Sequence, residues 1–171
     1  MNYFEYLDTL PLVSSDLLNE VRYVASNSKS TFVDTKHSTY QIYSLHGKIA
    51  EFTKSIFNFK HSVSVQVIKN GVPVHVDIGR KVAYNYIIET GGSNVLTAYF
   101  NIDDFIQDRN NRHLKLFPKL DCPFAEPLYT VCIESNRWHK LNVSLPHTVL
   151  NIESERMAIT VTPHLLRRNI L

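Results

Sequence analysis

The sequence is poor in the residues that mark several common classes of protein. It has five glycines in 171 residues, and they form neither a phosphate-binding loop nor a dinucleotide-binding fingerprint. Its two cysteines, Cys122 and Cys132, are too few for a disulfide framework and lack the spacing of a zinc site. We therefore expect reduced thiols in a cytoplasmic protein.

The net charge and the distribution of hydrophobic residues are also ordinary for a globular protein. Eighteen basic and 16 acidic residues leave a net charge of +2, so no nucleic-acid partner is inferred. An apolar run long enough to cross a membrane is absent, and residues 1–5 do not resemble the start of a signal peptide. We expect one domain over residues 1–171 with no membrane partner, and the composition favours no particular oligomeric state.

Helical spacing dominates the first third of the chain. Apolar residues recur every three or four positions over Asp16–Ala25 and again over Gly47–Phe57, which predicts two helices. A strand is predicted between them, over Tyr40–Leu45. Residues 1–60 are therefore expected to form a mainly helical buttress for the rest of the domain.

The hydrophobic period changes to two from Ser62 onward. Val63, Val65 and Val67 alternate with polar residues, and Asn70-Gly71 is a strong turn signal. Further strands are predicted over 72–77, 81–90, 95–100, 128–134, 138–144, 148–151 and 157–162. Helices followed by a series of short strands favour a mainly β fold, a jelly-roll-like barrel over residues 62–163.

Residues 101–127 interrupt this series. We predict a long insertion with one helical turn at its start. Insertions of this length are often lids or substrate-binding segments. A surface excursion without a role in substrate recognition is the alternative.

Candidate metal ligands occur in two distant segments. His75 and Asp77 are two positions apart on a predicted strand, so their side chains point to one face. Two histidines and one carboxylate with open positions suit non-haem Fe(II), and His147, just after Pro146, is the best third ligand. Because His-x-Asp often arises by chance, the alternative is a half-exposed histidine with an aspartate at a strand end.

Arg156 begins the last predicted strand. Alternate residues from Arg156 to Thr162 share one face, and that face has the character of a barrel interior with one cation. A buried arginine requires an anionic partner, and its planar fork matches a carboxylate. A pairing with Glu153 or Glu155 across the preceding turn is the alternative.

Together these residues resemble the signature of the Fe(II)/2-oxoglutarate-dependent dioxygenases. His75-Val76-Asp77, His147 and Arg156 carry the resemblance. The prolyl hydroxylase branch is especially similar, through the stretches 79–80, 146–149 and 156–161, and short phage-encoded members are similar too. The resemblance extends over residues 63–162.

The resemblance implies a double-stranded β-helix, the jelly roll shared with cupins. It implies O2-dependent oxidation of a substrate, with 2-oxoglutarate converted to succinate and CO2. The implied roles are Fe(II) ligation by His75, Asp77 and His147, 2-oxoglutarate binding by Arg156 and Asn85, and substrate contact by Arg80 and the 101–127 insertion. The family's cosubstrate-binding tyrosine is not matched to Tyr84, Tyr86 or Tyr99 in particular.

The substrate is the least specified part of this hypothesis. Hydroxylation of a peptidyl proline or of another amino-acid side chain is the favoured reaction, and the substrate is either a small molecule or a protein. Two other hypotheses are a cupin-like metal-binding protein without 2-oxoglutarate chemistry and a β-sandwich binding module. Bound metal separates the last from the others, and succinate formation separates the first two.

Overall fold

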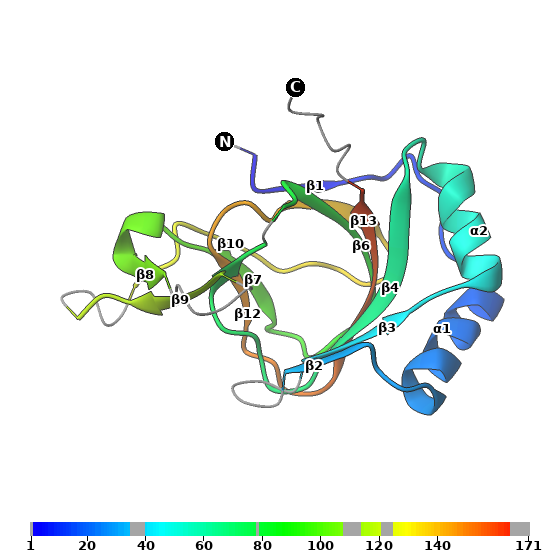
Figure 1. Ribbon diagram of the computed structural model, residues 1–171, viewed down its shortest axis with the longest axis horizontal. Helices are drawn as coiled ribbons and strands as arrows, with labels where there is room; N and C mark the ends of the chain where they lie inside the picture. Colours follow the sequence, from blue (N-terminus) through cyan, green and yellow to red (C-terminus); the bar gives the residue numbers. More distant parts are fainter. Residues whose placement is uncertain (1, 35–39, 78, 108–113, 121–124, 165–171) are drawn as a thin grey trace, which may run out of the picture.

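Two antiparallel sheets face each other across the core, and two helices pack on the outside of the larger sheet (Figure 1). This structure is a computed structural model, and it describes residues 2–34, 40–77, 79–107, 114–120 and 125–164. No helix in these ranges is both long and apolar enough to cross a membrane. The arrangement is that expected of a double-stranded β-helix.

The larger sheet has seven strands in the order β1-β11-β6-β13-β4-β3-β2. Their bounds are β1 Phe4–Tyr6, β11 Trp138–Asn142, β6 Val82–Thr90, β13 Arg156–Pro163, β4 His61–Ile68, β3 Tyr40–Ser44 and β2 Phe32–Asp34. β13 lies at the centre of the sheet and pairs with both β4 and β6. Because side chains alternate along each strand, the sheet has one apolar face that packs on the helices and one mixed face that lines the barrel interior.

Helices α1 (Ser15–Asn27) and α2 (Gly47–Ile56) cover the apolar face, as Figure 1 shows. The hydroxyl of Ser14 accepts a hydrogen bond from the backbone N–H of Leu17 and caps α1. Val21 of α1 and Ile49 of α2 are fully buried in the cluster that also contains Ile159 of β13. The two predicted helices are confirmed, and they hold β13 in place from outside.

The smaller sheet has six strands in the order β10-β7-β12-β5-β9-β8. Their bounds are β10 Tyr129–Val131, β7 Leu96–Tyr99, β12 His147–Leu150, β5 His75–Val76, β9 Leu114–Pro118 and β8 Phe105–Gln107. β5 is shorter than the predicted strand 72–77. Pro73 has no backbone N–H to donate to a ladder, which limits pairing on its side of β5.

The 101–127 segment is more regular than predicted. The expected helical turn is present as the 3-10 helix η1 (Ile102–Asp104), but β8 and β9 then form a hairpin that extends the smaller sheet. Phe105 is buried on one face of this hairpin, whereas Ile106 and Phe117 pair on the other face and are half exposed. Figure 1 shows the hairpin extending away from the helices.

The first 60 residues contain the predicted strand, observed as β3, and two strands that were not predicted, β1 and β2. β1 pairs with β11 at one edge of the larger sheet, and β2 and β3 extend its other edge. β1 and β2 are three residues long, too short to show a hydrophobic period. β1 pairs with a strand far along the chain, and β2 is held at the sheet edge by β3, the next strand.

Candidate metal centre

The structure brings His75, Asp77 and His147 together. One ligand atom from each lies within 4.8 Å of the others. His75 on β5 and His147 on β12 are direct partners across the smaller sheet, and their ring centroids are 4.3 Å apart. Asp77 follows β5 directly, and its Oδ1 lies 3.7 Å from Nε2 of His75.

Both histidines are held in the same tautomer by the backbone. Nδ1 of His75 donates to the carbonyl of Pro73 at 2.9 Å, and Nδ1 of His147 donates to that of Leu145 at 2.9 Å. A carbonyl can only accept, so the proton sits on Nδ1 and the lone pair of Nε2 faces the cluster. Burial, followed by the neighbouring imidazole of His75, lowers the pKa of His147 to about 4. The ring is therefore neutral at pH 7, the form that binds a metal.

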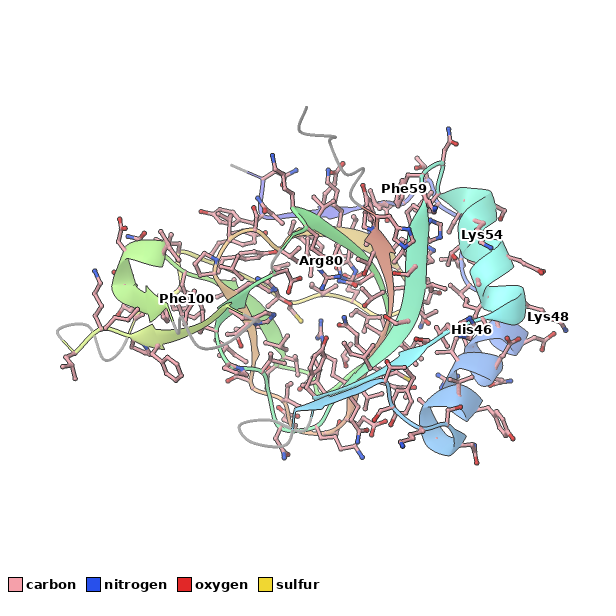
Figure 2. All side chains as sticks on the ribbon, viewed as in Figure 1. His46, Lys48, Lys54, Phe59, Arg80 and Phe100 are labelled. Atoms are coloured by element: carbon pink, nitrogen blue, oxygen red, sulfur yellow. The ribbon has the colours of Figure 1, made fainter. Side chains whose placement is uncertain are left out.

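Arg80 holds the other side of the Asp77 carboxylate. Its Nε and Nη2 both lie 2.7 Å from Oδ2 of Asp77, and its Nη1 donates to the hydroxyl of Thr162 at 2.7 Å. Figure 2 shows Arg80 between the two sheets. Oδ2 is thus committed to the guanidinium, whereas Oδ1 is the carboxylate oxygen on the histidine side. The substrate contact predicted for Arg80 would have to come from its remaining N–H groups.

A cavity of about 90 Å³ runs from the histidines to Arg156. The side chains of His75 and Asp77 are 23% and 16% exposed. Arg156 is 5% exposed and Thr160 is 1% exposed. The cavity is therefore open at the histidine end and closed at the arginine end.

Arg156 is buried without a carboxylate partner among the described residues. Its Nη1 donates to the carbonyl of Thr90 at 3.2 Å. The alternative pairing across the turn is not observed, because Glu155 pairs with Lys69 at 3.5 Å and Glu153 makes no ion pair within the described ranges. Burial lowers the pKa of Arg156 to about 10, so the guanidinium stays charged at pH 7. A buried cation of this kind fits an anionic ligand.

Three other polar groups at the cavity wall lack hydrogen-bond partners within the described part of the chain. They are Oδ1 of Asn85 and the hydroxyls of Thr97 and Thr160, and all three residues line the cavity. Each unpaired buried group costs about 1–3 kcal/mol. Asn85, the candidate cosubstrate contact, therefore faces the cavity, and the closed end is fitted for a polar ligand.

The tyrosine at the cavity is one that the sequence did not single out. Tyr84 and Tyr86 point from β6 towards the helices, and the hydroxyl of Tyr99 donates to the carbonyl of Tyr3 at 2.8 Å. Tyr40 lines the cavity instead. Burial raises its pKa above the usual range, while the charge of Arg80 opposes that shift. Its position depends on β3 pairing with β4, which no local pattern indicates.

The sequence matches no protein-family model and no curated protein. Solved structures do match. A prolyl hydroxylase from Trichoplax adhaerens, in complex with a hypoxia inducible factor peptide, aligns with a TM-score of 0.58 at 14% identity over 95% of this chain and 84% of that chain. A Pseudomonas putida prolyl-4-hydroxylase aligns with a TM-score of 0.53 at 12% identity, over 96% and 94%.

The fold is that of the 2-oxoglutarate-dependent oxygenases. A third match, the non-haem α-ketoglutarate-dependent epimerase SnoN from nogalamycin biosynthesis, has a TM-score of 0.54 at 10% identity over 95% of this chain and 77% of that chain. The predicted double-stranded β-helix and its prolyl-hydroxylase-like form are confirmed. At these identities the likeness concerns the fold alone.

Acid is expected to destabilise the metal-free protein. Burial lowers the pKa of His147 to about 4 and that of His139, a second buried histidine, to about 3, whereas the unfolded value is near 6.5. The unfolded chain therefore binds more protons below pH 6.5, and stability falls as the pH drops from there towards 4. Each histidine should contribute a loss of about 1.5 kcal/mol between pH 6.5 and 5.

Urea unfolding at pH 7.5, 6.5 and 5 measures this loss. A His139→Phe protein, which keeps a ring of similar shape, should lose less stability over the same interval. Equal acid sensitivity of the two proteins would contradict the assignment of His139 as a buried neutral group.

Proposed function

We propose that this protein is an Fe(II)- and 2-oxoglutarate-dependent dioxygenase that hydroxylates an amino-acid side chain. The observation that supports this most directly is the pairing of two sites in one cavity. A cluster of two histidines and one carboxylate lies at its open end, and a buried arginine that has no carboxylate partner among the described residues lies at its closed end. A metal-binding protein without an anionic cosubstrate has no use for that cation.

His75, Asp77 and His147 would hold the iron. The atoms they would offer are two imidazole nitrogens and one carboxylate oxygen, which is the ligand set of non-haem Fe(II) oxygenases. Bound Fe(II) and 2-oxoglutarate supply the oxidation by O2, in which 2-oxoglutarate loses CO2 to give succinate and one oxygen atom enters a C–H bond. The carbonyls of Pro73 and Leu145 keep both rings oriented, which is the usual task of groups behind metal ligands.

Arg156 would bind the distal carboxylate of 2-oxoglutarate. Its fork can donate two parallel hydrogen bonds to a carboxylate, and its burial excludes competing water. Asn85 and Thr160 supply further polar groups beside it. The keto-acid end of the cosubstrate would then face the two histidines, which line the same cavity.

The substrate would approach from the open end, where Arg80 contacts Asp77; Tyr40 also lines the cavity. A peptidyl proline is favoured by the resemblance to prolyl hydroxylases, and another amino-acid side chain fits the same role. Arg80 has a second task in this proposal, because it fixes the carboxylate of Asp77 so that one oxygen remains for the metal. The β8–β9 hairpin is the part of the 101–127 segment that would meet a substrate.

Succinate formation tests this function. Purified protein supplied with Fe(II) and 2-oxoglutarate should release succinate slowly without a prime substrate, and the release should stop under nitrogen or with a chelator. His147→Ala is the matched negative control. Metal binding without any succinate would favour the cupin-like alternative, and absence of metal binding would favour a binding module.

A further inference from the structure

Thr97 is a buried hydroxyl residue at the cavity to which the proposed function gives no task. It lies on β7 of the smaller sheet and is 2% exposed. Its Oγ1 is buried and makes no hydrogen bond to any described residue, although the residue lines the cavity. A buried hydroxyl without a partner has lost its hydrogen bonds to water and gained none in return. A ligand in the cavity that accepts from this hydroxyl would account for its orientation.

Strand alternation turns Thr97 towards the cavity. Side chains two apart on a strand share a face, so Thr97 lies on the same face of β7 as Tyr99, the cross-strand partner of His147. Ala98, between them, packs into a separate apolar cluster on the opposite face. Thr97 itself pairs with Val149, which also lines the cavity. The row of Thr97 and Val149 is therefore two residues further along the sheet than the row that contains His147.

The turn that precedes β7 brings Thr97 to the end of the cavity that holds Arg156. β6 ends at Thr90, whose carbonyl accepts a hydrogen bond from Arg156, and residues 91–95 lead from there into β7. A Cβ at Gly91 would lie 2.9 Å from Cβ of Arg156, so this turn packs directly on the arginine. Thr97 is the second residue of β7 after the turn. It therefore faces the closed end from the smaller sheet, opposite the larger sheet that carries β13 (Figure 1).

A carboxylate at the closed end has room for donors from both sheets. It has two oxygens with about four lone-pair positions, and the fork of Arg156 can fill two of them as a bidentate pair. Asn85 and Thr160 stand on the same sheet as the arginine. Of the described cavity-lining residues on the smaller sheet, Thr97 is the polar residue outside the cluster of candidate metal ligands. Its hydroxyl is thus the donor that can reach the ligand from the other side.

We infer that Thr97 is a further cosubstrate-binding residue, whose hydroxyl donates to the distal carboxylate of 2-oxoglutarate from the smaller sheet while Arg156 binds that carboxylate from the larger sheet. This inference rests on the proposed function. It gives the sheet that would hold the iron a direct contact with the far end of the cosubstrate. A ligand without an acceptor at this end would leave the hydroxyl unpaired, so Thr97 also contributes to the selection of a dicarboxylate.

A role in packing alone gives opposite expectations for two substitutions. Thr97→Val keeps the shape of the side chain and removes the hydroxyl, whereas Thr97→Ser keeps the hydroxyl and removes the methyl group. If Thr97 only fills space, the serine protein should be the weaker binder of cosubstrate. If Thr97 binds the carboxylate, the valine protein should be the weaker binder. The melting temperature of the valine protein should match or exceed that of the wild type, because an unpaired buried polar group is removed.

Calorimetric titration of Mn(II)-loaded protein with N-oxalylglycine, a non-reacting analogue of 2-oxoglutarate, measures this binding. Thr97→Val is expected to raise the dissociation constant about tenfold, the effect of one lost hydrogen bond to a charged group, and Thr97→Ser should stay within about threefold of the wild type. Oxalate, which can chelate the ion but has no distal carboxylate, should bind both variants as it binds the wild type. Thr130→Val, which removes an exposed hydroxyl from the neighbouring strand β10, is the matched control and should change neither constant.

Three results would overturn the role of Thr97 and leave the proposed function intact. The first is an unchanged N-oxalylglycine dissociation constant in Thr97→Val. The second is an equal loss of affinity for oxalate, which would place the effect at the metal, and the third is a loss in Thr97→Ser as large as that in Thr97→Val, which would assign it to packing. If the wild-type protein fails to bind Mn(II) or N-oxalylglycine, the proposed function fails, and the role of Thr97 fails with it.

Discussion

Replacement of Asp77 by alanine is expected to abolish iron binding and succinate formation together. Asp77 is the sole carboxylate in the cluster of three, and its loss removes the negative charge that offsets a divalent cation. It also leaves the guanidinium of Arg80, now 2.7 Å from Oδ2 of Asp77, without its anion and close to the metal position. Loss of groups that merely support a ligand costs 10–100-fold in metal affinity, so we expect more than 100-fold here.

Fe(II) or Mn(II) titration, followed by the succinate assay, measures this effect. Asp103→Ala, which removes an exposed carboxylate of η1, is the control and should match the wild type. Metal affinity within tenfold of the wild type in Asp77→Ala would show that the ion binds elsewhere.

An Arg156→Met protein is expected to lose 2-oxoglutarate binding while its fold becomes no less stable. The guanidinium is buried without a carboxylate among the described residues, so an apolar side chain of similar length removes an uncompensated charge. Truncation of one member of a buried charge pair costs about 2–5 kcal/mol of binding. We therefore expect the KM for 2-oxoglutarate to rise at least 30-fold, with Mn(II) affinity unchanged.

Steady-state kinetics and thermal unfolding measure the two halves of this prediction. Arg22→Met is the matched control, because Arg22 forms an exposed ion pair with Glu89 and contacts no part of the cavity. A large fall in melting temperature of Arg156→Met, with an unchanged KM, would assign Arg156 to the fold and not to the cosubstrate.

The parts of the site that could be predicted are those that depend on strand alternation. His75 with Asp77, and Arg156 with Thr160, share a face because side chains two apart on a strand point the same way. That rule needs no knowledge of which strands are neighbours. The convergence of His147 with His75 needed the family resemblance, since nothing local states that β12 pairs with β5.

The parts that were missed depend on which strands are neighbours or on the path of a local turn. Tyr40 reaches the cavity because β3 joins β4, and Arg80 turns back to Asp77 through Gly79, which has a φ of +79°. The β8–β9 hairpin was missed because its strands are three and five residues long. Short strands carry too few alternations to show a period, and their pairing is decided by the rest of the sheet.

The central position of β13 has a consequence for synthesis of the chain. β13 is inserted between β4 and β6, which both leave the ribosome long before it. Until it docks, the facing edges of those two strands have no partner, and unpaired edges are prone to aggregate. Because Arg156 is the first residue of the same strand, the step that closes the larger sheet also brings the buried arginine into the cavity, so the sheet and the proposed cosubstrate site are completed together.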